Sequence, residues 1–390
     1  MIVTRLVSAT AALLACTTAL CSCAPVPGIA PHGGGDSGAR DSGSSDSGSS
    51  DGGSSDGGAT TFDYPLDDVL RLNHAQVLGT HNSYHVAHDP PLVVEWGYTH
   101  APLDVQLEEQ GVRQFELDVR YEPETGRFEV YHVPVIDEET TCLAFVDCLQ
   151  TIAAWSAAHP AHLPIFVLVE PKDEGAPEPF VDHVDDFEAE LRSVFPDDRH
   201  LTPDALQGEA DTLRDAVLDA GGWPVLGQIR GTVIFGLLDG GEARDAYTRN
   251  GTSLAGRAMF ADMDDPAHPL ASFFLVDDPV AGAASIASAV DQGFLVRTRA
   301  DAGSEEPLAG DDSRLQAALA SGAHFLSTDY PAPVEGVDYV AAIPGGTPAR
   351  CNPRTAPAAC TSTALEDPAF MNPAPHRALR PGATRSPAGG

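Results

Sequence analysis

The sequence predicts an α/β fold, a (β/α)8 TIM-like barrel, over residues 61–361. Two observations carry this prediction. Short β-rich apolar runs alternate with helix-like stretches, which is typical of a parallel sheet covered by helices. Nearly every run also ends in a polar or ionisable residue, and the carboxyl ends of barrel strands converge on one face, where active sites lie.

Residues 1–23 read as an export signal. Arg5 precedes the apolar stretch "LVSATAALLACTTAL", which is too short to span a bilayer comfortably. "LCSC" resembles a bacterial lipobox that would make Cys23 the lipid-modified first residue, and "LLAC" at Cys16 is a weaker competitor. We therefore expect an exported protein, anchored by lipid at Cys23, with simple secretion as the alternative.

Residues 24–60 form a Gly/Ser/Asp-rich segment, and residues 362–390 form a Pro-rich C-terminal tail. The first segment contains almost no apolar side chain, so it cannot bury enough surface to order itself. We expect it to act as a flexible tether between the anchor and the barrel.

The chain order of the predicted elements follows from the same alternation. The β-rich runs are "QVLGTH", "QFELDVR", "FEVYHV", "IFVLVE", "TVIFGLLD", either "AMFADMD" or "FFLVDD", "FLVRTR" and "HFLSTD". Helices are predicted over 143–159, 178–195, 280–290 and 313–322. The second and third runs are joined only by "YEPETGR", which favours a hairpin or an abbreviated connection and predicts a distorted barrel.

Four cysteines fall within the predicted barrel, at Cys142, Cys148, Cys351 and Cys360. Export permits disulfides, so we expect Cys142–Cys148 and Cys351–Cys360, with four separate buried thiols as the alternative. The spacings lack CxxC pairs, which argues against a zinc cluster.

The charge balance limits the partners. The formal net charge is −35, with 22 Lys and Arg against 57 Asp and Glu. A nucleic-acid binder needs a basic footprint, and bulk attraction to anionic lipid is disfavoured for the same reason. An anionic substrate would need a local cation, either a metal ion or an Arg/Lys pair.

The strand ends supply suitable chemistry. The oxygen-donating residues there are Asn82, Glu116, Asp118 and Glu170, and oxygen ligands suit calcium or magnesium better than zinc. Glu116 and Asp118 are two residues apart on one predicted strand, so both can point inward. His81 and His132 can transfer protons near neutral pH, which together with a metal suits phosphodiester cleavage.

The motifs "GTHNSYH", "FELDVR", "EVYHV" and "FVLVEPKD" occur in this order and resemble the catalytic X-region of phosphoinositide-specific phospholipases C. The later "FLVRTRADAG", "ALASGAHFLSTDYP" and "ARCNPRTAPAAC" are similar to the secreted bacterial calcium-dependent phosphatidylinositol phospholipases C. The resemblance covers residues 62–361.

This resemblance implies a calcium-dependent phosphodiesterase that cleaves the glycerol–phosphate bond by attack of the inositol 2-hydroxyl, giving diacylglycerol and a cyclic inositol phosphate. It implies His81 and His132 as the catalytic pair, Asn82, Glu116, Asp118 and Glu170 as Ca²⁺ ligands, and Lys172, Arg297 and Arg299 as substrate-binding residues. Which group is the general base stays open, because a carboxylate such as Glu116 could also serve as the base. The implied partner is a phosphoinositide or glycosylated inositol lipid at a membrane surface, and we expect a monomer.

Several alternatives stay open. Glu116 and Asp118 could pair with Arg113 or Arg120 at the surface, and Arg297 and Arg299 could pair structurally with Asp301 or Asp329. Asp239 and Asp329 could be supporting residues or surface charges, whereas His85, His88 and His100 are expected to be loop residues. The alternative functions are a glycerophosphodiester phosphodiesterase, which typically opens with His-Arg-Gly where this chain has His81, Asn82 and Ser83, and a non-enzymatic calcium-binding surface lipoprotein.

Overall fold

The computed structural model describes residues 62–173, 176, 178–219, 222–345 and 348–370. The predicted export signal, lipidation at Cys23 and tether lie outside the described residues, as does the tail from residue 371 onward. Within the described part, no helix is both long and apolar enough to cross a membrane.

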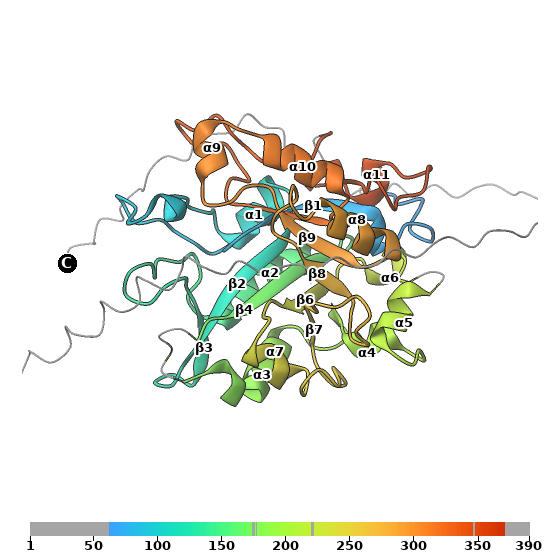
Figure 1. The fold of residues 1–390 in the computed structure, drawn as a ribbon, viewed down its shortest axis with the longest axis horizontal. Coiled ribbons are helices and arrows are strands. Elements are labelled where there is room, and N and C mark those ends of the chain that lie inside the picture. Colours follow the sequence, from blue (N-terminus) through green and yellow to red (C-terminus); the bar gives the residue numbers. More distant parts are fainter. Residues whose placement is uncertain (1–61, 174–175, 177, 220–221, 346–347, 371–390) are drawn as a thin grey trace, which may run out of the picture. The chain divides into compact units, whose positions relative to one another are not determined.

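Eight parallel strands form the barrel (Figure 1). They are β1 (Ala75–Thr80), β2 (Val112–Glu122), β4 (Ile165–Pro171), β6 (Val233–Leu237), β7 (Met259–Ala261), β8 (Phe273–Leu275), β9 (Leu295–Arg299) and β10 (Phe325–Thr328). Strand β10 pairs back onto β1, whereas β7 and β8 meet in the described chain at one bridge, between Asp262 and Phe273. The predicted barrel is confirmed, with its distortion at this seam.

Three further strands lie outside the ring of eight. β3 (Arg127–Val130) pairs antiparallel with β2, β11 (Ala349–Cys351) pairs antiparallel with β1, and β5 (His200–Leu201) pairs with the first half of β6. "FEVYHV" is thus the second arm of a hairpin rather than a barrel strand. "AMFADMD" and "FFLVDD" both contribute barrel strands, so the expectation of one or the other was wrong. Residues 262–272 join them without a helix, and the usual alternation is lost there.

The predicted helical stretches correspond to α2, α3, α8 and α10 and are confirmed. The α-helices are α1 (Leu103–Glu109), α2 (Phe145–Ala158), α3 (Val184–Val194), α4 (Pro203–Gln207), α5 (Leu213–Leu218), α6 (Leu226–Ile229), α7 (Glu242–Tyr247), α8 (Ala283–Gln292), α9 (Glu305–Ala309), α10 (Ser313–Ser321) and α11 (Ser362–Leu365). Short 3₁₀ turns are η2 (Leu72–His74), η3 (Val94–Trp96), η4 (Phe180–Asp182) and η5 (Pro368–Phe370). Helix α2 buries Phe145, Leu149 and Ile152, which share one face because 3.6 residues make a turn.

Aromatic rings fill the barrel interior near the amino ends of the strands. The rings of Phe166 and Phe325 stack with centroids 4.6 Å apart, and Phe273 meets Phe166 edge-on at 5.4 Å. A Cβ at Gly236 would lie 2.8 Å from the Phe166 ring, so glycine gives this ring its space. Toward the carboxyl ends of the strands, the inward positions of β2 and β4 become polar, so the aromatic layer forms the floor of a polar mouth.

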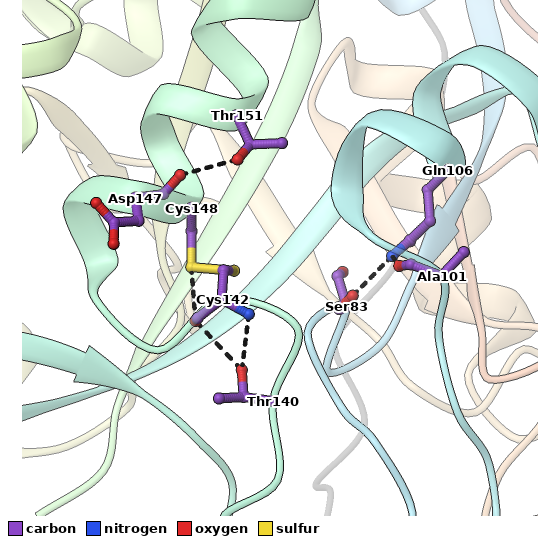
Figure 2. Close-up of a disulfide and its surroundings, with 8 residues drawn as sticks. All are labelled: Ser83, Ala101, Gln106, Thr140, Cys142, Asp147, Cys148 and Thr151. Carbon is purple, nitrogen blue, oxygen red and sulfur yellow. Dashed lines mark hydrogen bonds between the residues drawn. A yellow bond between two sulfur atoms is a disulfide. The ribbon is translucent and has the colours of Figure 1, made fainter. Parts of the chain in front are cut away.

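Both predicted disulfides are confirmed, Cys142–Cys148 and Cys351–Cys360. The first joins the loop before α2 to the first turn of that helix (Figure 2). The folded part also continues past residue 361. Glu366, which follows α11, is fully buried and accepts a 3.0 Å hydrogen bond from Arg113, so the segment up to Phe370 packs on the barrel.

Candidate active site

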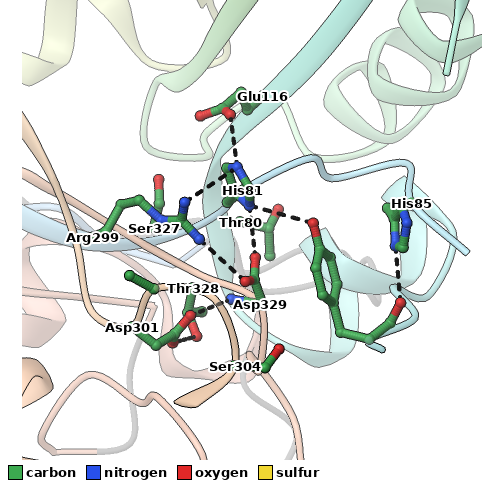
Figure 3. A network of polar contacts seen from close by, with 12 residues as sticks. Thr80, His81, His85, Glu116, Arg299, Asp301, Ser304, Ser327, Thr328 and Asp329 are labelled. Carbon is green, nitrogen blue, oxygen red and sulfur yellow. Dashed lines mark hydrogen bonds and ion pairs between the residues drawn. The ribbon is translucent and has the colours of Figure 1, made fainter. Parts of the chain in front are cut away.

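His81 stands at the end of β1 between two carboxylates and a guanidinium (Figure 3). Its Nδ1 lies 2.8 Å from Asp329, and its Nε2 lies 3.6 Å from Glu116 and 3.4 Å from Arg299. An ionised carboxylate only accepts hydrogen bonds, so Nδ1 carries the ring proton and Nε2 keeps a lone pair. Burial and the nearby Arg299 charge hold the pKa of His81 well below its usual value. The geometry thus presents a neutral imidazole with Nε2 able to take a proton.

Asp329 is buried at the end of β10, and its backbone is held in place by Asp301. Its backbone N–H donates to Asp301 at 2.9 Å, and the Tyr339 hydroxyl donates to Asp301 at 3.0 Å. Burial and the neighbouring Asp329 raise the pKa of Asp301 to about 7. Asp329 therefore supports His81 rather than lying at the surface, whereas Asp239 accepts hydrogen bonds from the backbone of its own loop.

The three predicted carboxylate ligands gather on neighbouring strands. Glu116, Asp118 and Glu170 each offer an oxygen within 4.8 Å of the others, and Asp118 lies directly opposite Glu170 in the β2–β4 register. Both Asp118 carboxylate oxygens are buried without a hydrogen-bond partner among the described residues. Burial and the Glu170 charge raise the pKa of Asp118 well above its usual value. An all-oxygen donor set in which the Asp118 oxygens have no hydrogen-bond partner among the described residues fits a hard cation such as Ca²⁺.

Asn82, the fourth predicted ligand, is buried in the turn after β1. Its φ of 42° lies in the left-handed region, which asparagine tolerates better than most residues. The backbone N–H of the next residue, Ser83, donates to the Glu116 carbonyl at 2.9 Å. This hydrogen bond holds the turn that contains Asn82 against β2. The structure thus brings this amide to the side of the barrel that carries the carboxylates.

Cationic groups border the same site. Lys172 Nζ lies 2.5 Å from Glu170 and 3.6 Å from Asp118, and Arg297 donates to Glu116 at 2.6 Å. The other Arg297 nitrogens contact Asp277 and Ser327, while Arg299 pairs with Asp329 at 3.2 Å. All three predicted substrate-binding cations therefore lie beside the predicted catalytic and ligand residues.

The alternative surface pairing of the β2 carboxylates is wrong. Arg113 pairs with Glu366, and Arg120 donates to the backbone carbonyls of Lys172 and His132, each at 2.8 Å. Glu116 and Asp118 point into the barrel, and Arg113 alternates to the opposite face of β2, as the two-residue period of a strand predicts.

His132 follows β3 and forms a second histidine–carboxylate pair. Its Nδ1 lies 2.6 Å from Asp137, its ring is edge-on to Trp96 at 5.1 Å, and its side chain is 18% exposed. The same Asp137 carboxylate accepts a 2.9 Å hydrogen bond from His85, which is fully buried. Although burial opposes it, hydrogen bonding to His132 and His85 lowers the pKa of Asp137 to about 2.

Sequence reasoning missed Asp137 and underrated His85 and His100. His85 is in a loop as expected but is buried against Asp137, and His100 Nε2 donates to the His81 carbonyl at 2.9 Å. In the sequence, Asp137 is only an acid five positions beyond His132. Two further acids follow it in the "IDEET" loop, and nothing in the sequence distinguishes the three.

A β/α barrel that sets two histidines, each with its own carboxylate, around a three-carboxylate cluster and several cations has the parts of a metal-assisted phosphodiesterase. The model of the Ca²⁺-dependent phosphoinositide phospholipase C family matches residues 70–131 and 127–353. The chain belongs to this family of phosphodiesterases.

Two solved structures of one enzyme support the fold. The calcium-dependent phosphoinositol-specific phospholipase C of a Gram-negative Pseudomonas sp. is 16% identical in its apo form, with a TM-score of 0.51, over 74% of this chain and 98% of that one. Its myoinositol complex is 17% identical, with a TM-score of 0.52 and the same coverage. The Ca²⁺-dependent phosphatidylinositol-specific enzyme of Streptomyces antibioticus is 21% identical, with a TM-score of 0.48, over 67% of this chain and 96% of that one. No curated protein matches the chain.

Proposed function

We propose that the chain cleaves the glycerol–phosphate bond of phosphatidylinositol or a glycosylated inositol lipid. The observation that carries this proposal is the lone pair of His81 Nε2 beside Glu116, at the edge of the carboxylate cluster. His81 Nε2 takes the proton of the inositol 2-hydroxyl, whose oxygen attacks phosphorus. His132 gives a proton to the departing glycerol oxygen. The products are diacylglycerol and a cyclic inositol phosphate.

Asn82, Glu116, Asp118 and Glu170 would hold Ca²⁺. When bound, the ion supplies positive charge against the phosphate as negative charge builds on its oxygens. Arg299, beside His81, and Lys172, beside the carboxylates, add fixed positive charge on either side. Arg297 holds Glu116 in place through their buried ion pair.

Exposed apolar side chains lie on the two loops that carry Trp96 and His132, and they suit a lipid surface. Leu92, Val93 and Val94 lie on the loop after β1, and Val135, Ile136 and Leu143 lie on the loop after β3. We call these six residues the apolar rim. Val135 is 85% exposed, and the Trp96 ring of the first loop contacts His132. Exposed apolar groups gathered at the mouth of a polar site are typical of membrane docking.

Val94→Asp combined with Val135→Asp should weaken binding to phosphatidylcholine vesicles containing phosphatidylinositol by about tenfold or more, since each valine contributes on the order of 1 kcal/mol when buried in lipid. Sedimentation with vesicles measures this. Cleavage of a soluble substrate should be unchanged. Val69→Asp, an exposed valine before β1, is the matched control and should bind like wild type. Unaltered vesicle binding of the double variant would rule out the apolar rim as the docking surface.

We also propose that the chain is exported and held at a membrane by lipid on Cys23. The two disulfides support export because such bonds persist in oxidising compartments. An anchor there would keep the barrel close to lipid without requiring basic surface charge.

One assay tests the proposed function directly. Phosphatidylinositol and glycerophosphoinositol are incubated with the enzyme, with and without Ca²⁺, and the products are separated. We expect a cyclic inositol phosphate from phosphatidylinositol only when Ca²⁺ is present. Faster hydrolysis of glycerophosphoinositol to glycerol phosphate would indicate a glycerophosphodiester phosphodiesterase, and no turnover of either would indicate a binding protein.

A further inference from the structure

We propose that Asp137 and His85 are positioning residues for His132: the Asp137 carboxylate, itself fixed by His85, holds the His132 ring so that Nε2 is the atom that protonates the leaving oxygen. This inference rests on the proposed function and assigns a role to two residues that do not belong to the carboxylate cluster.

The hydrogen bonds define which ring atom is available. His132 Nδ1 lies 2.6 Å from Asp137 Oδ2, and His85 Nε2 lies 2.9 Å from the same oxygen and 3.1 Å from Oδ1. An ionised carboxylate accepts but does not donate, so both rings turn an N–H toward it. His132 Nδ1 is thereby occupied, which leaves Nε2 as the nitrogen that can exchange a proton with substrate.

His85 cannot readily turn away from this contact. Its Nδ1 donates to the Tyr98 carbonyl at 2.9 Å, and its ring packs against the Tyr98 ring with centroids 4.5 Å apart. His85 and Asp137 are both essentially inaccessible to solvent, whereas the His132 side chain is partly exposed. Two rigid buried groups therefore hold one accessible ring.

Backbone pairing delivers Asp137 to this place. Asp137 and Val133 exchange hydrogen bonds of 2.9 and 3.0 Å that close a tight loop just after His132. The rest of the loop pairs with the segment after β1, because Val86 donates to the Glu139 carbonyl at 3.2 Å and Thr141 donates to the Tyr84 carbonyl at 2.8 Å. The position of Asp137 is thus set by main-chain bonds and does not depend on the carboxylate's own contacts.

We call Asp137 and His85, which together hold the His132 ring, the clamp. Because of it, His81 and His132 have different carboxylate partners and different surroundings. His81 has Asp329 as its partner and lies among arginines, whereas His132 has Asp137 and lies beside Trp96. Each ring has its own carboxylate partner, so loss of the clamp should affect protonation of the leaving group more than attack by the inositol hydroxyl.

Asp137→Asn tests this division. Asparagine carries no negative charge, and its NH2 group cannot accept a hydrogen bond from a ring N–H. Turnover of phosphatidylinositol should therefore fall by about tenfold to a thousandfold, as when the partner of a functional histidine is lost. Turnover of the 4-nitrophenyl ester of inositol phosphate, whose leaving group needs no proton, should stay within about threefold of wild type. Glu139→Gln, an exposed acid on the same loop, is the matched control and should behave like wild type on both substrates.

A matched pair of variants tests His85. The amide of His85→Asn replaces Nδ1 and can keep the hydrogen bond to the Tyr98 carbonyl, whereas that of His85→Gln replaces Nε2 and can keep the bond to Asp137. We expect the asparagine variant to lose more turnover on phosphatidylinositol than the glutamine variant, with near-equal turnover on the 4-nitrophenyl ester. Equal losses on phosphatidylinositol would refute the role of His85.

The outcomes separate this inference from the function on which it rests. Equal loss on both substrates would show that Asp137 is merely structural, and full activity of Asp137→Asn on phosphatidylinositol would also overturn the clamp. In both cases the proposed function still holds if the wild type cleaves phosphatidylinositol and if His132→Ala loses more activity on phosphatidylinositol than on the 4-nitrophenyl ester. A wild type that cleaves neither substrate overturns both. If the clamp acts through His132, the variant that combines His132→Ala with Asp137→Asn should be no slower than His132→Ala alone.

Discussion

His132→Ala should lower turnover of phosphatidylinositol by about two to four orders of magnitude while leaving the barrel folded, as expected when a positioned acid is removed. The side chain lies beyond the end of β3, is partly exposed and packs on Trp96 at the mouth, so its loss removes little from the core. Steady-state kinetics on vesicles measure the effect, and circular dichroism with thermal melting checks the fold.

The leaving group distinguishes His132 from His81. A 4-nitrophenyl leaving group departs without a proton, so it should restore most of the activity of His132→Ala and little of that of His81→Ala, whose missing ring is needed to activate the attacking hydroxyl. Equal rescue of the two variants would contradict the assignment of acid to His132 and base to His81.

Chelation should abolish cleavage of phosphatidylinositol reversibly and change the melting temperature by only a few degrees. In the proposed mechanism the chemical step depends on the charges of Glu116, Asp118 and Glu170, whereas the fold depends on the aromatic packing, the buried strands and the two disulfides. Activity is followed as Ca²⁺ is added back, and differential scanning calorimetry records the melting temperature. Full activity in excess chelator would refute a catalytic calcium site and favour a mechanism run by the histidines and an arginine.

The carboxylates can be tested singly. Glu170→Gln and Asp118→Asn should each weaken Ca²⁺ binding, measured by calorimetric titration, together with activity, because each removes one negative charge from the ligand set. Asp239→Asn is the matched control: Asp239 also follows a barrel strand, but it bonds its own loop and should leave Ca²⁺ binding unchanged. Wild-type affinity in both ligand variants would place the ion elsewhere.

Local rules predicted the parts of the site that lie on strands. The spacing of two residues places Glu116 and Asp118 on one face, and the end of the next barrel strand delivers Glu170 beside them. The same rule identified His81, Arg297 and Arg299, because the carboxyl ends of parallel strands meet at one edge of the barrel.

The contacts that the sequence did not predict lie on loops or join residues that are far apart in the sequence. Asp137 reaches His132 and His85 only because its loop pairs with the segment after β1, and no periodicity in the sequence encodes that pairing. The Arg113–Glu366 ion pair joins groups 253 positions apart, so the packing of the segment after residue 361 was equally hidden. Two barrel strands joined without a helix, β7 and β8, likewise give no alternation to detect.

The seam between β7 and β8 has a consequence for how such a chain can diversify. The proposed catalytic, ligand and cationic groups come from β9, β10, β1, β2 and β4 with the loops that follow them, a contiguous arc of the barrel that excludes β7 and β8. Residues 264–267, between β7 and β8, are exposed. Doubling the length of such a loop costs only about 0.6 kcal/mol in closure entropy. Insertions can therefore accumulate at this seam and build new surface, while the arc that carries the proposed site keeps its register.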